Sequence, residues 1–223
     1  MAADRSNDRL ITALAADLTP VRRLSAPVLR ALGWLAIVAA VAAVLAALCD
    51  IGAVSRRLSA APDLWLAAIG SALTMVLAAV AAFELSLPDR KPMWALLPVP
   101  GAILWIAASG TGCLRSWFVV ATRSQTVAET EHCLAFIVGL SIPLAVVLIV
   151  MLRRGYSLHP NLTAIVGGLA CAAAAATLLN FFHPFDATAT DLGVHAFAVA
   201  FVIVAARFFE GRILANKKTL APL

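Results

Sequence analysis

The sequence predicts an all-α protein: a polytopic membrane bundle of six transmembrane helices with a short cytoplasmic N-terminal amphipathic helix. Three observations predict this fold. The 223 residues are 62% hydrophobic and their mean hydropathy is +0.95, so a soluble globule of this length would expose far more apolar surface than it buries. Six apolar stretches are each long enough to cross a hydrocarbon core of about 30 Å. These stretches lack the polar alternation of membrane strands, which favours helices.

The N-terminal segment contains the predicted amphipathic helix, over residues 8–18. Ser6 or Asn7 can cap its start, and Thr19-Pro20 ends it. At about 100° per residue, its apolar side chains fall on one arc of about 140°. These side chains are Leu10, Ile11, Leu14, Ala15 and Leu18.

The apolar face of this helix needs a cover, because a helix of about eleven residues is marginally stable alone. Two covers fit. The inner membrane leaflet can take the face, helped by the basic residues at positions 22, 23 and 30. Alternatively, the helix docks in a groove of a partner protein, with Leu10, Leu14 and Leu18 as anchors. The acidic residues at positions 4, 8 and 17 favour a protein, because anionic lipid attracts a purely basic face.

The six spans follow in order, and each is bounded by turn residues. They are predicted at 32–49, 64–83, 94–109, 133–152, 162–182 and 192–209. Pro and charged residues between them are typical of turns at a membrane surface. Pro98, Pro100 and Pro143 predict kinks inside the third and fourth spans. Gly167, Gly168 and the alanines at 172–176 predict that the fifth span packs closely in the bundle interior.

These elements divide the chain into three parts. Residues 1–30 form a cytoplasmic segment, 31–210 the transmembrane domain and 211–223 a cytoplasmic tail. Within the domain, the longest connection is predicted at 110–131 as an outer loop. Its apolar part, 113–120, is too short to span and is expected to dip into the membrane interface.

Basic residues orient the bundle. Positive charge near the end of a span resists translocation, so Lys and Arg gather on the cytoplasmic side. If the N-terminus is cytoplasmic, thirteen of the 17 Lys and Arg residues lie on that side. This orientation is therefore predicted. The same bias accounts for the net charge of +5, so direct nucleic-acid binding is not predicted. About 30 residues containing three aspartates precede the first span, which predicts that the chain carries no secretory signal peptide.

Two other classes of function fit the sequence less well. A small-solute transporter usually needs ionisable residues near the membrane midplane. Here Glu84, Arg207 and Glu210 all lie toward span ends, where they are expected to reach water. A quinone-linked thiol oxidoreductase needs reactive cysteine pairs, and the sequence contains no CxxC motif. We therefore predict that the protein is not an enzyme.

Thiols and imidazoles gather on the predicted outer face. Three of the four Cys and three of the four His lie there: Cys49, Cys113, His132, Cys133, His183 and His195. Cys133, His132, His183 and His195 form a chemically sensible set for a transient metal ion, and outer thiols can be oxidised. The alternative is that these are ordinary polar residues at wet helix ends. No resident cofactor is predicted, and Cys171 is expected to pack as a small apolar residue.

The N-terminal string and the spans together resemble a known family. Leu10-x3-Leu14-Ala15-x-Asp17-Leu18-x-Pro20-Val21-Arg22-Arg23-Leu24, then Pro27, Cys133 and Arg153-Arg154, resembles the NrsF family of bacterial inner-membrane anti-sigma factors. The resemblance implies that the protein retains an extracytoplasmic-function (ECF) sigma factor at the membrane until an envelope signal releases it. The outer thiols and imidazoles suggest that this signal is a metal or an oxidant. The resemblance also implies that the N-terminal segment binds sigma. The implied contact residues are Leu10, Ile11, Leu14, Asp17, Leu18, Pro20, Val21, Arg22 and Arg23.

One position departs from the family pattern. Where the family often has His-Cys after the fifth span, this chain has His183-Pro184. The disulfide that the resemblance would imply between that position and Cys133 is therefore impossible. A switch would have to pair Cys113 or Cys49 with Cys133, or use a histidine-based metal site. The signal, the particular sigma factor and the oligomeric state are left open.

Overall fold

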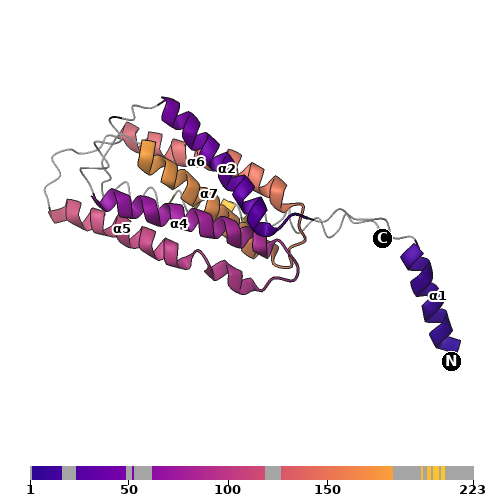
Figure 1. Cartoon of the computed structure of the whole chain (residues 1–223). Coiled ribbons are helices and arrows are strands. Elements are labelled where there is room, and N and C mark those ends of the chain that lie inside the picture. The colour runs from indigo at the N-terminus through magenta and orange to yellow at the C-terminus, as the bar shows by residue number, and fades with distance from the viewer. Residues whose placement is uncertain are drawn as a thin grey trace.

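The computed structural model describes residues 2–16, 24–48, 52, 62–118 and 127–182, together with 197, 200, 201, 203–205, 207 and 208. None of these described residues lies in a strand. The helices are α1 (Ala2–Ala16), α2 (Pro27–Leu48), α4 (Pro62–Leu85), the 3-10 helix η1 (Pro92–Leu96), α5 (Val99–Phe118), α6 (Val127–Leu152) and α7 (Pro160–Phe182). Figure 1 shows α2, α4, α5, α6 and α7 side by side as a bundle, with α1 standing apart beyond one end.

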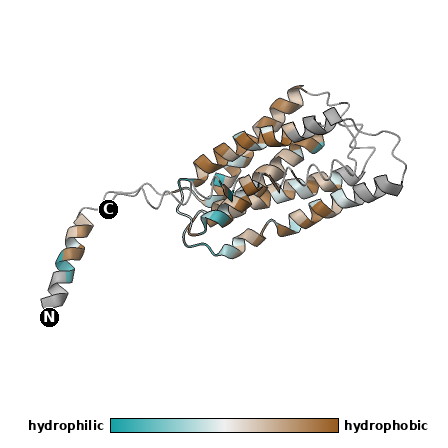
Figure 2. Cartoon of the chain, turned by 180° about the vertical axis from the view of Figure 1, so that it is seen from behind, coloured by the Kyte–Doolittle hydropathy of each residue, from teal (hydrophilic) through white to brown (hydrophobic). Residues whose placement is uncertain are grey.

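Five segments of this bundle are long and apolar enough to cross a membrane. They are Pro27–Leu48, Trp65–Leu85, Pro92–Gly110, Ala135–Leu152 and Pro160–Phe181, which agree with the first five predicted spans. The sixth predicted span, 192–209, lies mostly outside the described residues, and the eight of its residues that are described are all helical. Figure 2 shows hydrophobic residues along the bundle and hydrophilic ones gathered at the end nearest α1.

Several predicted boundaries were wrong. The predicted outer loop at 110–131 is helical at both ends, because α5 continues to Phe118 and α6 begins at Val127. No proline interrupts residues 101–118, and extending an existing helix adds one hydrogen bond for each residue fixed. The helix predicted at 8–18 begins at Ala2 instead, and residues 17 and 18 lie outside the described part.

The prolines have different effects in the two spans. In the third span η1 ends at Leu96 and α5 begins at Val99, so the helix is broken beside Pro98. Pro100 lies in the first turn of α5, where its missing N–H costs little. Pro143 lies inside α6, which continues across it.

Helices α4 and α7 form the centre of the bundle. Of their apolar windows, 56% and 83% respectively are buried, against 17–28% for the other three spans. The alanines of α7 at positions 172–176 are all buried, and Cys171 is fully buried beside them, which confirms the predicted interior surface. Thr177 Oγ1 donates a hydrogen bond of 3.0 Å to Ser71 Oγ of α4. Small side chains thus let these two backbones approach closely.

Two glycines bring α4 and α5 into close contact. A Cβ at Gly70 of α4 would lie 2.7 Å from the Trp105 backbone, and a Cβ at Gly101 of α5 would lie 2.9 Å from the Thr74 amide nitrogen. Real Cβ atoms do not approach so closely, so both positions require the absence of a side chain. The two helices therefore meet by reciprocal glycine contacts about one turn apart.

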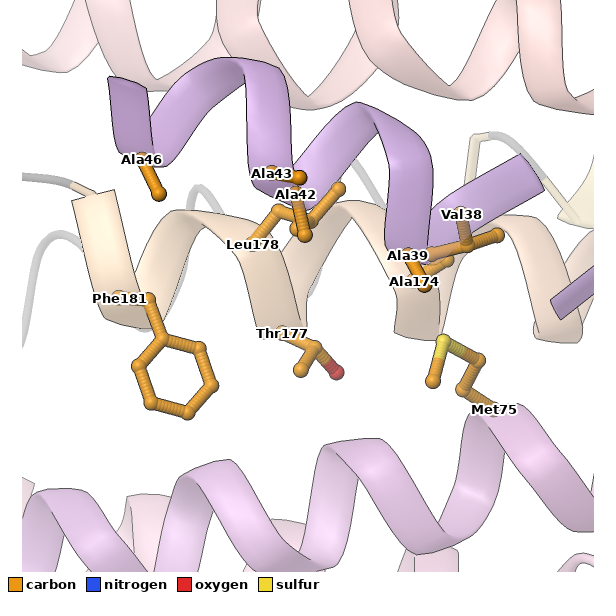
Figure 3. A pocket seen from close by; sticks show the side chains of 10 residues that line it. All are labelled: Val38, Ala39, Ala42, Ala43, Ala46, Met75, Ala174, Thr177, Leu178 and Phe181. Carbon is orange, nitrogen blue, oxygen red and sulfur yellow. The ribbon is translucent and has the colours of Figure 1, made fainter. Parts of the chain in front are cut away.

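An apolar pocket of about 430 Å³ lies between α2, α4 and α7 (Figure 3). The α2 side of the pocket is lined mainly by alanine. Figure 3 shows Met75 of α4 and Thr177 and Phe181 of α7 projecting into the space between the helices. The half of α2 that is remote from α1 therefore borders this pocket on one side, while Val41, Ala42 and Leu45 pack against the core of the bundle.

Candidate functional site

The apolar face of α1 is exposed. Leu10, Ile11 and Leu14 have 60%, 63% and 63% of their surface accessible, and their spacing places them on one face of the helix. On the opposite face, Thr12 Oγ1 donates a 2.7 Å hydrogen bond to the Asp8 carbonyl. The structure thus brings together three of the nine predicted sigma-binding residues. The other six, Asp17, Leu18, Pro20, Val21, Arg22 and Arg23, lie outside the described residues.

The predicted sensing residues fall at or beyond the edge of the described structure. Cys113 is a residue of α5, and His132 and Cys133 lie in the first two turns of α6. Helix α5 ends and α6 begins at the end of the bundle remote from α1 (Figure 1). The side chains at 111–134, and the residues Cys49, His183 and His195, are outside the described part. Among the described residues, no group of His, Cys, Asp and Glu could hold a metal ion, so the ligand set stays a prediction.

At the end of the bundle nearest α1, Arg30 is buried between three helices. Its side chain is 6% exposed. Its Nη1 donates to Ser86 Oγ just beyond α4 at 3.3 Å, and its Nη2 donates to the Met151 carbonyl in the last turn of α6. The guanidinium carbon also lies 4.9 Å from the centroid of the Phe83 ring, a favourable cation–π geometry. Arg30 of α2 therefore links the ends of α4 and α6.

The sequence predicted two roles for Arg30, as a charge that orients the bundle and as a basic residue near the inner leaflet, but no buried contacts. Its contacts come from residues 56 and 121 positions away, so no local pattern identifies them. The position of Arg30 was the usable signal. An arginine in the first turn of a span, three residues after Pro27, must either reach water or find partners among neighbouring helices.

The prediction that the Glu84 side chain reaches water was wrong. Glu84 is 5% exposed, and its Oε2 lies 3.0 Å from Arg90 Nε. A buried carboxylate requires such a partner, because removing a charge from water is costly. The Arg90 side chain is itself partly exposed, so the pair bridges the interior of the bundle and its surface.

The turn between α6 and α7 packs onto the same end. A Cβ at Gly155 would lie 2.5 Å from the Ser86 carbonyl oxygen. The turn after α6 and the turn after α4 therefore touch through their backbones. Thr163 Oγ1 is 3.3 Å from the Leu85 carbonyl and 2.8 Å from Ser157 Oγ. Together with Arg30, these contacts make a dense polar layer at the base of α2.

One turn further along α2, Trp34 contacts α6. It is fully buried, and its Nε1 donates a 3.2 Å hydrogen bond to the Leu144 carbonyl. Leu144 directly follows Pro143. Donor and acceptor are 110 positions apart, so no local sequence pattern identifies this hydrogen bond.

Comparison with known proteins gives one match. A protein-family model described as NrsF, negative regulator of sigma F, matches residues 14–215 of the chain. The match thus begins at Leu14 and runs through all five described spans. No curated protein and no solved structure matches the chain.

Proposed function

Because the chain belongs to the NrsF family of negative regulators of sigma F, we propose that it is a membrane anti-sigma factor that binds an ECF sigma factor through its N-terminal segment. The observation that carries this proposal is the exposed apolar face of α1, formed by Leu10, Ile11 and Leu14. Each such side chain gains about 1.5–3 kcal/mol when it is fully buried. A groove on the sigma factor, occupied in competition with core polymerase, is the cover that we propose.

We further propose that the protein lies in a bacterial inner membrane, with α1 and both termini on the cytoplasmic side. The support is the excess of Lys and Arg at that end and the hydrophilic residues around the base of the bundle (Figure 2). This orientation puts α1 where a sigma factor is available. It puts the start of α6, with His132 and Cys133, at the opposite membrane surface.

Release follows from a change at that outer end, by metal binding or by thiol oxidation. The proposed residues are Cys133, His132, His183, His195, Cys113 and Cys49. Weakening the sigma complex tenfold needs only about 1.4 kcal/mol of coupling between the two ends. A modest displacement of packed helices supplies a free energy of this size.

The proposal is tested by co-purifying sigma factors with the detergent-solubilised chain. The intact protein is compared with a shortened form that lacks residues 1–24. This deletion stops before the start of α2 at Pro27. We expect the intact chain to retain a sigma factor and the shortened chain to lose it while it still inserts in the membrane. Failure of the intact chain to bind any sigma factor would refute the anti-sigma proposal.

Cys133→Ser tests the outer sensor. Serine cannot form a thiolate, so it removes the soft ligand and the oxidisable group. We expect the variant to bind sigma normally but to lose release by thiol-reactive metals or oxidants, measured as sigma-dependent transcription in cells. Cys171→Ala, a change in the fully buried core, is the matched control and should respond like the parent. An unchanged response of Cys133→Ser removes Cys133 from the sensor.

A further inference from the structure

Helix α6 runs between the two ends that the proposed function must connect. Its first turns contain His132 and Cys133, and its last turn contains Met151. Figure 1 shows α6 beginning at the end remote from α1 and ending near the start of α2. Helix α2, in turn, directly follows the sigma-binding segment. A movement of α6 that α2 must follow would therefore reach the residues that bind sigma.

Two hydrogen bonds make α2 follow α6. Arg30 donates to the Met151 carbonyl and Trp34 Nε1 donates to the Leu144 carbonyl. Both donors are buried, at 6% and 0% exposure. A buried N–H that loses its acceptor cannot turn to water instead, so the displacement of either carbonyl carries a penalty unless the donor moves with it.

The other half of α2 has open space beside it. Beyond Val38 it borders the apolar pocket, with Ala39, Ala42 and Ala46 along the wall (Figure 3). Short side chains facing an open volume give few contacts that resist a shift of the helix. Helix α2 is thus hydrogen-bonded to α6 in the half near α1, whereas the other half meets its neighbours only through apolar contacts, such as those of Val41 and Leu45, and borders the pocket.

Helix α6 contains a proline, Pro143, between its two functional parts. Pro143 has no N–H, so the Gly139 carbonyl loses its partner in the helix. The hydroxyl of Ser141, two residues earlier, is buried and has no hydrogen-bond partner among the described residues. A weakened backbone ladder beside an unsatisfied polar group is a place where a helix bends readily. His132 and Cys133 lie on one side of this point, and both acceptor carbonyls lie on the other.

We propose that α6 bends at Pro143 in response to the outer signal and that the hydrogen bonds from Arg30 and Trp34 pass this movement to α2 and so to the sigma-binding segment. The inference rests on the proposed function for its physiological meaning. The mechanical coupling of α6 to α2 is testable without it.

The test is a double-mutant cycle on the full-length protein in detergent. Pro143→Ala restores the missing N–H, and Trp34→Phe removes the donor but keeps an aromatic ring. We expect Pro143→Ala to change the Kd for the sigma factor by about threefold or more, the low end of coupling within one network. In the Trp34→Phe background the same change should have a clearly smaller effect, because only the hydrogen bond from Arg30 to Met151 then links α2 to α6. Trp65→Phe, at a partly exposed tryptophan of α4, is the matched control background and should leave the effect of Pro143→Ala intact.

Equal effects of Pro143→Ala in the parent and in Trp34→Phe would overturn the inference, as would no effect in the parent. If Trp34→Phe fails to fold, as judged by its elution profile and thermal melting, Arg30→Met, which removes the donor to the Met151 carbonyl, replaces it in the cycle. If the parent binds no sigma factor, the proposed function fails. The coupling is then measured by hydrogen exchange at the α2 amides of residues 30–38. Pro143→Ala should change these rates about threefold in the parent, and a change of the same size in Trp34→Phe would overturn the coupling.

Discussion

Leu14→Asp is expected to weaken sigma binding by about 100-fold or more. Burial of a leucine side chain contributes about 1.5–3 kcal/mol, and placing a carboxylate in the same apolar groove adds the cost of desolvating a charge. A 100-fold loss corresponds to about 2.7 kcal/mol, so the two effects together suffice. The measurement is the Kd of the solubilised full-length chain for its sigma factor, with membrane insertion checked in parallel. Leu14 is the first residue of the family match and is 63% exposed.

Thr12→Asp is the matched control for that experiment. It adds the same charge to the same helix, about 200° around from Leu14, and it removes only the hydrogen bond from Thr12 to the Asp8 carbonyl. We expect its Kd to stay within about threefold of the parent value, because exposed polar changes rarely cost more than about 0.5 kcal/mol. Retention of sigma by Leu14→Asp would refute the docking helix. Equal damage by both variants would show that added charge, not the apolar face, is responsible.

Gly70→Leu is expected to destabilise the bundle by about 3 kcal/mol or to prevent its assembly. The new Cβ would lie 2.7 Å from the backbone of Trp105, and a backbone cannot rotate away as a side chain can. A movement of α5 away from α4 would also break the second close contact, where a Cβ at Gly101 would lie 2.9 Å from the Thr74 amide nitrogen. The measurement is the thermal midpoint and folded fraction of the purified protein in detergent.

Gly139→Leu provides the comparison at a glycine without close neighbours. Apart from its two chain neighbours and the backbone of its own helix, no atom of the described residues lies within 4 Å of a Cβ built at Gly139, although it is also a glycine in the middle of a span. We expect its thermal midpoint to match or exceed that of the parent, since leucine has the higher helix propensity. Comparable losses in the two variants would mean that glycine flexibility, and not the contact of α4 with α5, accounts for the effect.

The spans and the α1 face were predictable because each depends on residues close together in the sequence. Apolar composition over about 20 residues decides a span, and the spacing of Leu10, Ile11 and Leu14 decides a helix face. The end of α5 was not predictable in this way. The polar and apolar residues at 110–118 fit a loop as well as a helix, and only the absence of proline favoured the helix that forms.

The buried contacts of α2 were beyond sequence reasoning for a physical reason. Whether Arg30 faces water or the interior depends on Ser86 and on the Met151 carbonyl, whose positions follow from packing and not from local pattern. The same holds for Gly70, which looks like any glycine in a span until Trp105 is placed against it. The outer ligand set poses the harder case, because its four members must meet across different helices.

The central position of α4 and α7 has a consequence for how the chain is made. Ser71 of α4 and its partner Thr177 of α7 are 106 positions apart. A ribosome adds about 5–20 residues per second, so α4 leaves it roughly 5–20 s before the surface that covers it exists. During that interval the Ser71 hydroxyl has the carbonyl of Ala68, which it still contacts at 3.1 Å, as an acceptor within its own helix. The contact between the two central helices, α4 and α7, is therefore among the last to form during biogenesis.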